Sequence, residues 1–509
     1  MLKRILGFTL AMVLIVSLVA CGQTKEQNDE KTDAPAAFSV GYAKADISPK
    51  ESVPMGGYSD SDTRWSQNTE LPLELICVAM TDEEGETVLF FAADLLMAYD
   101  YVADDLRNAV SAATGVPKDH IIYHVTHNHY GPETHLRGTT AIDLFVKNQT
   151  EEGVRIAQEA LADRAAAKME TGFTRLEGIN FVRHYLLKDG SYIGEGVGAV
   201  KNDVVGHAYA PDNLLQAVKF TREGKKDIVL VNWQGHLMAD GAGYNSANSC
   251  SPGIMRKELE KTGDCLPIFI LGGSGNMNNT SQINSEKKFD TYVEHGQYMA
   301  QQVMGLTYQQ AQTGKIFLEE SVLSLSNRGA MHDVPLYAFS IGDVAFATAP
   351  AEIFSKNAQA VRDSSQYPMT LYASCANGYN GYLPTPDAFP YYAYEVRITK
   401  YPQGTAETLQ EEHIKMLKKM FSDAGYTEKT KAEGYVTPAF EPVSDGVEYV
   451  RVSTEATAVE NGFYAFQMFA GMEVKNMLAI DEATAQKALS RETGKLLFNE
   501  QNVVVGIAE

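Results

Sequence analysis

Histidine side chains gather in one short stretch of the chain, and their spacing suits a metal site. His127 and His129 directly follow the apolar run Ile121–Val125, and His124 and His135 lie nearby. Side chains alternate between the two faces of an extended chain, so His127 and His129 lie on the same face. Neutral imidazole is a common zinc ligand, and a second histidine can stabilise an oxyanion or carry a proton. The stretch therefore indicates a metal-assisted hydrolytic site, although a hydrogen-bonded pair is the simpler explanation of two such histidines standing alone.

Three more residues of suitable chemistry follow apolar runs elsewhere in the chain. They are His236, Glu352 and Tyr382. Each has a structural explanation when taken alone: a packed histidine, a carboxylate at the start of a helix, or a core aromatic. Their joint placement after separate runs favours one shared site over three unrelated structural roles.

The runs that precede these residues are short and apolar, as in buried β-strands. Each ends in a loop with polar or ionisable side chains. Because functional sites of open α/β sheets gather outside the carboxyl ends of the strands, we expect these loops to converge. Two histidines, a glutamate, a tyrosine and an aspartate would then meet. The six runs are Val88–Ala92, Ile121–Val125, Ile228–Trp233, Ile268–Leu271, Val344–Ala347 and Thr370–Ala373.

Strand-like runs alternate with amphipathic segments along the chain, which predicts an α/β fold with mixed β-sheets and flanking helices. A large catalytic domain is expected over residues 38–426. The composition changes near residue 427, and residues 427–509 are expected to form a small β-rich or mixed region. The predicted helices are Asp104–Thr114, Thr150–Ala166, Ser251–Lys261, Tyr292–Thr307 and Thr405–Gly425.

The first residues predict export and lipid anchoring. Lys3 and Arg4 precede the apolar run Ile5–Val19, and Leu18–Cys21 matches the bacterial lipobox, in which the cysteine becomes lipidated. The following residues are polar and charged, as in a flexible spacer. We expect a membrane-anchored lipoprotein outside the cytoplasm. The expected divisions are a signal peptide over residues 1–20 and the lipidated Cys21 with its tether over residues 21–37.

The formal net charge of -22 argues against a nucleic-acid partner. Beyond Cys21 the chain has Cys77, Cys250, Cys265 and Cys375, and none shows the CxxC spacing of a cysteine zinc site. A disulfide between Cys250 and Cys265 is compatible with an exported protein, but the sequence leaves the pairing open.

Several segments, in order, resemble the catalytic domain of the neutral (alkaline, non-lysosomal) ceramidases. Thr126–Pro132 resembles that family's T-H-T-H-S-G-P, and Asn232–His236 resembles its N-W-x-x-H. Pro350–Glu352 resembles P-G-E. The further matching segments are Gly41–Ser48, Met55–Tyr58, Ala93–Leu95 and Asn377–Tyr382, the last of which continues through Thr385, Tyr394 and Glu395 to Tyr401–Gly404.

This resemblance implies a zinc ion bound by His127, His236, Glu352 and Tyr382, with His129 facing the substrate. Tyr382 would also take part in proton movement. The expected substrate is a lipid or another small molecule with an N-acyl bond. Residues expected to contact it are Asp94, Gly275, Asn276 and Tyr379.

The chain also departs from the family pattern. The family's G-D-V-S-P-N aligns with Gly275–Thr280, so Asn276 replaces aspartate and Asn278 replaces serine. Glu133 and Thr134 stand where the family has two glycines. Asparagine cannot serve as a hydroxyl nucleophile, but its amide can donate to an oxyanion. The sequence therefore predicts a zinc hydrolase that cleaves an amide with metal-activated water. The alternatives are another exported amide or ester substrate, or a non-catalytic solute-binding lipoprotein.

Overall fold

A computed structural model describes the fold over residues 37–58, 63–136, 138–187, 192–194, 203–236, 244–279, 289–391, 393–436, 495–498 and 504–508. The signal peptide, Cys21 and nearly all of the tether lie outside these residues, as does most of the C-terminal region. None of the helices among the described residues has the length and hydrophobicity that a membrane span requires.

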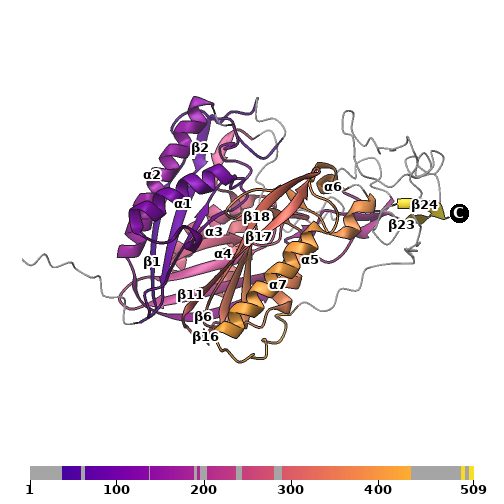
Figure 1. The fold of residues 1–509 in the computed structure, drawn as a ribbon. Helices are drawn as coiled ribbons and strands as arrows, with labels where there is room; N and C mark the ends of the chain where they lie inside the picture. Colours follow the sequence, from indigo (N-terminus) through magenta and orange to yellow (C-terminus); the bar gives the residue numbers. More distant parts are fainter. Residues whose placement is uncertain are drawn as a thin grey trace, which may run out of the picture. The chain divides into compact units, whose positions relative to one another are not determined.

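Two β-sheets stack on each other, and helices cover their outer faces (Figure 1). The larger sheet has nine strands in the order β14-β12-β11-β6-β1-β3-β4-β5, with β16 also paired to β6. The predicted α/β class with mixed sheets and flanking helices is confirmed. The strands are β1 (Ser39–Asp46), β3 (Glu74–Thr81), β4 (Thr87–Ala93), β5 (Ile121–Val125), β6 (Ala165–Arg175), β11 (Leu214–Arg222), β12 (Asp227–Trp233), β14 (Cys265–Leu271) and β16 (Gln309–Ala311).

The smaller sheet has four strands in the order β17-β18-β19-β21. Phe339 and Phe346 stack at 4.3 Å between ring centroids, and both pack against Phe90 of the larger sheet. The two sheets therefore share one apolar interior. The strands are β17 (Ile316–Asn327), β18 (Ala330–Ile341), β19 (Val344–Thr348) and β21 (Met369–Ala373).

Helices bury the outer faces of both sheets, which explains the unbroken apolar runs of the central strands. In β3, for example, Leu75 and Cys77 face a core formed with helices, whereas Ile76 and Val78 face the second sheet. All five predicted helices exist, and α5 and the short α6 are additional. The helices are α1 (Asp100–Thr114), α2 (Thr140–Ala162), α3 (Cys250–Thr262), α4 (Tyr292–Met304), α5 (Ser355–Ser364), α6 (Tyr394–Ile398) and α7 (Thr405–Asp423).

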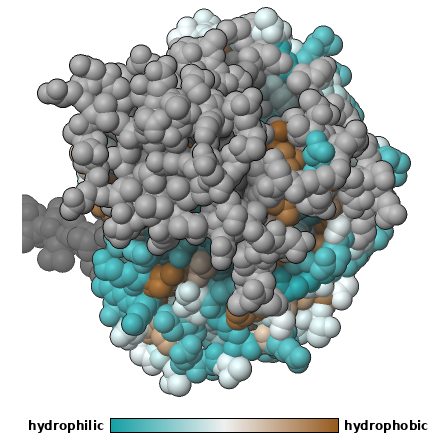
Figure 2. Space-filling model, turned by 90° about the vertical axis from the view of Figure 1, so that its right-hand side faces the viewer, coloured by the Kyte–Doolittle hydropathy of each residue, from teal (hydrophilic) through white to brown (hydrophobic). Residues whose placement is uncertain are grey.

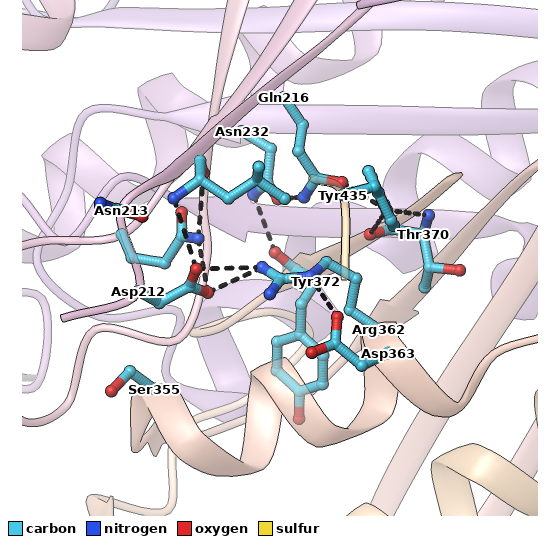
Figure 3. Close-up of polar contacts among 12 residues, drawn as sticks. Asp212, Asn213, Gln216, Asn232, Ser355, Arg362, Asp363, Thr370, Tyr372 and Tyr435 are labelled. Carbon is cyan, nitrogen blue, oxygen red and sulfur yellow. Dashed lines mark hydrogen bonds and ion pairs between the residues drawn. The ribbon is translucent and has the colours of Figure 1, made fainter. Parts of the chain in front are cut away.

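A buried polar network lies between the two sheets (Figure 3). The hydroxyl of Tyr435 donates to Gln216 on β11 at 2.6 Å and accepts from the backbone N–H of Thr370 on β21 at 2.8 Å. The amide of Asn232 on β12 donates to the carbonyl of Tyr372 at 3.0 Å. Apolar packing is not directional, whereas these hydrogen bonds are, so they favour one register between the sheets.

The two edge strands of the larger sheet meet through one histidine. His124 of β5 donates through Nδ1 to the carbonyl of Ser374 at 2.8 Å, and its Nε2 accepts from the N–H of Leu271 at 3.0 Å. Leu271 ends β14, and Ser374 directly follows β21. The carboxyl ends of β5, β14 and β21 therefore lie side by side.

Hydrophilic residues cover most of the described surface on the face in Figure 2, and hydrophobic residues form small patches there. In the C-terminal region, the described residues 495–498 and 504–508 pair as antiparallel strands.

Candidate metal centre

The strands predicted from the six apolar runs all exist, and five of them carry the residues of this centre. His127 follows β5, His236 follows β12, and the Gly-rich loop follows β14. Glu352 follows β19 and Tyr382 follows β21, where they pair directly in the short parallel strands β20 (Glu352–Ile353) and β22 (Tyr382–Leu383). The two histidines come from the larger sheet and the other two residues from the smaller one, so the stacking of the sheets assembles the centre.

Four side chains converge at the centre. The Nε2 atoms of His127 and His236 are 3.1 Å apart, and each lies 3.2 Å from Oε2 of Glu352. The hydroxyl of Tyr382 lies 3.3 Å from Nε2 of His236. All four residues are buried. Zinc with ligand bonds of about 2.0–2.1 Å in a tetrahedral arrangement separates its ligand atoms by roughly 3.3–3.4 Å, so the observed spacing fits such an ion.

Backbone contacts fix the tautomer of each histidine. Nδ1 of His127 lies 2.9 Å from the carbonyl of Leu96, and Nδ1 of His236 lies 2.9 Å from that of Ser274. A carbonyl only accepts, so each Nδ1 carries a proton, and in a neutral ring each Nε2 turns a lone pair toward the other and toward Glu352. Lone pairs and a carboxylate repel one another at this distance unless a cation lies between them.

His129 completes the buried histidine cluster. Candidate ligand atoms of His127, His129 and His236 all lie within 4.8 Å of one another. Nδ1 of His129 donates to the carbonyl of Gly57 at 2.8 Å, and Nε2 has no hydrogen-bond partner among the described residues. Burial, reinforced by the two neighbouring histidines, lowers the pKa of His129 well below its usual value. His129 is therefore neutral, with an Nε2 lone pair available beside the other ligands.

Glu352 is held as a carboxylate with two distinct oxygens. Burial favours a raised pKa, but positive charge at His127 and His236, which a bound cation would replace, holds the pKa of Glu352 well below its usual value. Oε1 accepts a hydrogen bond from the hydroxyl of Tyr379 at 2.5 Å, while Oε2 faces the histidines. Burial and the charge of Glu352 raise the pKa of Tyr379, so this donor keeps its proton. Tyr379, expected to contact substrate, thus orients Glu352.

A buried arginine beside Tyr382 was not predicted as part of the site. Arg183 lies 5.4 Å from the centre of the Tyr382 ring, and it donates to Glu395 at 2.5 Å and to the carbonyl of Gly275 at 2.8 Å. Burial raises the pKa of Tyr382, and Arg183 opposes that rise. Arg183 belongs to no sequence motif that would have indicated its role. The nearest signal was Glu395, which belongs to a segment with family resemblance.

The Gly-rich loop after β14 packs against the segment that carries Glu352. A Cβ atom on Gly275 would lie 2.6 Å from the carbonyl oxygen of Glu352, so only glycine permits this approach. Asn276 accepts from the N–H of Ser355 at 2.9 Å. Asn278 pairs through its backbone with His236. Gly275 and Asn276 therefore fasten the loop, and Asn278 lies next to a candidate ligand.

Asp94 does not join the converging side chains. It is fully buried and binds Arg256 through both carboxylate oxygens, at 3.1 and 2.5 Å. Its contacts therefore favour a structural role rather than the expected contact with substrate. The disulfide that the sequence left open between Cys250 and Cys265 is absent, because the four cysteines of the described residues are free thiols.

His127 has a backbone φ of 58°, in the left-handed region that residues with a side chain rarely adopt. Cys375 and Asn377, which follow β21, share this feature with φ values of 53° and 58°. Strained backbone of this kind persists only where surrounding contacts hold it, and it often marks functional sites.

The fold and the buried histidine cluster together define an α/β protein with a candidate metal centre, and solved structures show which fold it is. The neutral ceramidase from Pseudomonas aeruginosa matches with a TM-score of 0.63 at 15% identity, over 81% of this chain and 79% of that one. A ceramidase complexed with C2 matches with a TM-score of 0.62 at 14% identity and the same coverage. No family model and no curated protein matches the sequence. The chain therefore has the neutral ceramidase fold with a strongly diverged sequence.

Proposed function

We propose that this protein is a zinc-dependent amidohydrolase that cleaves the amide bond of an N-acyl lipid of the ceramide type. The observation that carries the proposal is the convergence of two histidine Nε2 atoms and one carboxylate oxygen within 3.2 Å of one another. Such a set of acceptors suits a divalent cation. The N/O donors are the ligands that catalytic zinc takes in proteins.

His127, His236, Glu352 and Tyr382 would hold the ion. When bound, zinc would supply a Lewis acid that lowers the pKa of water to about 7 and so provides hydroxide at neutral pH. The remaining steps belong to the chain's own residues.

His129 is suited to move the proton. Because its Nδ1 proton is committed to the carbonyl of Gly57, its Nε2 can take a proton from the attacking water. It can then give that proton to the leaving nitrogen as the amide bond breaks. The Asn278 amide would donate to the carbonyl oxygen of the substrate as negative charge develops there. Arg183 would stabilise negative charge on Tyr382.

The substrate class rests on the shared fold, since one of the matching structures is a ceramidase complexed with C2. A second candidate is an exported amide of another kind. Asn278 and Glu133 favour it, because the family pattern has a serine and a glycine at these positions. With either substrate, the protein would lie outside the cytoplasm and be tethered to the membrane through Cys21.

Metal analysis and an amide panel test the proposal. The purified protein should contain about one zinc per chain, and N-acyl amides should be hydrolysed. The variant His236→Ala should lose both, whereas His332→Ala, at a histidine of β18 outside the cluster, should lose neither. A wild-type protein without bound metal and without turnover on any amide or ester would contradict the proposal and favour a solute-binding role.

A further inference from the structure

The turn that carries His127 and His129 is built on the residues that end β4. The N–H of Thr126 donates to the carbonyl of Ala93, and the N–H of Asn128 donates to that of Leu95, both at 2.9 Å. Nδ1 of His127 donates to the carbonyl of the next residue, Leu96. The segment Ala93–Leu96 therefore acts as a template for this turn.

The turn needs such a template. The left-handed φ of His127 is unfavourable for any residue with a Cβ, so the free chain does not prefer it. If the template moved, the backbone would relax and the imidazole would turn away from its partners. The position of Nε2 in the centre therefore depends on the rigidity of the end of β4.

Asp94 provides the side-chain contacts of the template. Its Oδ1 accepts from the hydroxyl of Thr126 at 3.3 Å, and its backbone carbonyl accepts from the amide of Asn128 at 3.2 Å. These two residues flank His127. Asp94 is fully buried, so its carboxylate is stable there only with a charged partner.

That partner is Arg256 of α3. Its NH1 and NH2 donate to the two oxygens of Asp94 at 3.1 and 2.5 Å, and its Nε donates to Glu74 at 2.9 Å. The Arg256 side chain is 2% exposed. A two-pronged contact of this kind fixes the direction of the carboxylate as well as its position. Removal of Arg256 would leave a buried, unpaired carboxylate beneath the turn.

We propose that Arg256 is a positioning residue. From helix α3 it holds the left-handed turn of His127 through Asp94, and it thereby sets the geometry of the metal centre. The contacts alone support the role of Arg256 in holding the turn, whereas its effect on zinc rests on the proposed function. If Arg256 had only a structural role, its substitution would lower the stability of the protein without changing the metal centre.

The test compares Arg256→Met, Arg256→Lys and Asp94→Asn with Arg222→Met. Arg222 is a matched control, because its side chain is as buried as that of Arg256 and binds a carboxylate, Asp163, at 2.5 Å. It ends β11 beside the start of β12, whereas His236 follows the other end of β12. Two properties are measured on folded protein: the zinc Kd by competition with a chelator, and the hydrogen exchange of peptides that span residues 121–132. The second needs no metal.

Arg256→Met and Asp94→Asn should raise the zinc Kd on the order of 10–100-fold and speed exchange in the turn, as expected for a residue that orients a ligand. They should lower kcat more than they change KM. Arg256→Lys restores the charge but not the two-pronged contact, so its Kd should lie between those of Arg256→Met and wild type. Arg222→Met should leave the Kd and the exchange of the turn unchanged, even if it lowers the melting temperature.

A folded Arg256 or Asp94 variant with the hydrogen exchange and the zinc Kd of wild type would overturn the inference. Equal changes of both properties in Arg222→Met would overturn it as well. If Arg256→Met does not fold, Arg256→Lys and Asp94→Asn still decide the question. A wild-type protein that binds no zinc would instead contradict the proposed function, while the exchange of the turn would still show whether Arg256 holds it.

Discussion

Nε2 of His127 and Nε2 of His236 lie 3.1 Å apart, although the residues are 109 positions apart in the chain. In the neutral rings both nitrogens are acceptors, because a backbone carbonyl takes the Nδ1 proton on each ring. Two acceptors at this distance repel each other, and the approach of Glu352 adds a negative charge. A cation surrounded by these three groups would offset their mutual repulsion and explain why they lie so close together.

Tyr379→Phe should weaken zinc binding without unfolding the protein. The variant removes the hydroxyl that donates to Oε1 of Glu352, which frees the carboxylate to rotate. A partner of this kind typically contributes 10–100-fold to metal affinity, so we expect a rise in zinc Kd of roughly that size. Tyr367→Phe is the control, because its hydroxyl donates to Ser340 in a different core. Equal Kd values for the two variants would show that Tyr379 does not orient Glu352.

Asn278→Ala should slow turnover while zinc stays bound. Loss of one oxyanion donor typically lowers kcat by about 10²–10³, whereas the candidate ligands are untouched. Asn278→Ser should keep activity or shift it toward ceramide-like amides. Steady-state kinetics on the best amide of the panel measure both. If Asn278→Ala turns over like wild type, the Gly-rich loop has only a structural role.

The protein should lose stability as the pH falls below about 6.5. Burial lowers the pKa of His124 to about 3, against about 6.5 in an unfolded chain. Between these values the unfolded chain binds a proton that the folded protein excludes. As the pH is lowered below about 6.5, the free energy of unfolding should therefore fall by up to about 1.4 kcal/mol per pH unit for this group. Above about pH 6.5 this group should have no effect.

Urea unfolding at pH 7.5, 6.0 and 5.0 measures this effect, with a chelator present so that release of metal does not contribute. Burial also lowers the pKa of His413 to about 4, which adds in the same direction. Glu395 has a pKa of about 2, because Arg183 and His184 outweigh its burial, and so it contributes only below about pH 4.5. An unfolding free energy that stays constant from pH 7.5 to 5.0 would show that these histidines are not buried as neutral groups.

Cys21→Ala should release the protein from membranes. The prediction depends on the lipobox Leu18–Cys21 and on the polar spacer after it. Fractionation of cells that express wild type or variant measures the outcome. Unchanged retention of the variant in the membrane fraction would exclude lipidation as the anchor.

The sequence alone determined the strands and the polar residues that follow them. The run Ile121–Val125 matches β5 residue for residue, because a strand buried on both faces is apolar at nearly every position. It also indicated His127, His129, His236, Glu352 and Tyr382, since histidine, glutamate and tyrosine after strand ends are uncommon enough to be noticed together. These are local properties, which the order of residues expresses directly.

Only the tertiary structure decided which of these residues meet and what holds them. His127 and Glu352 come from different sheets, and their approach depends on the stacking of the sheets, which no local pattern encodes. Arg183 and Arg256 follow no motif, because an arginine that pairs with a buried carboxylate is recognised only by its partner. Asp94 also shows what only the tertiary structure decides: its position after β4 predicted contact with substrate, and the structure adds that its buried charge pairs with Arg256 of a helix far along the chain.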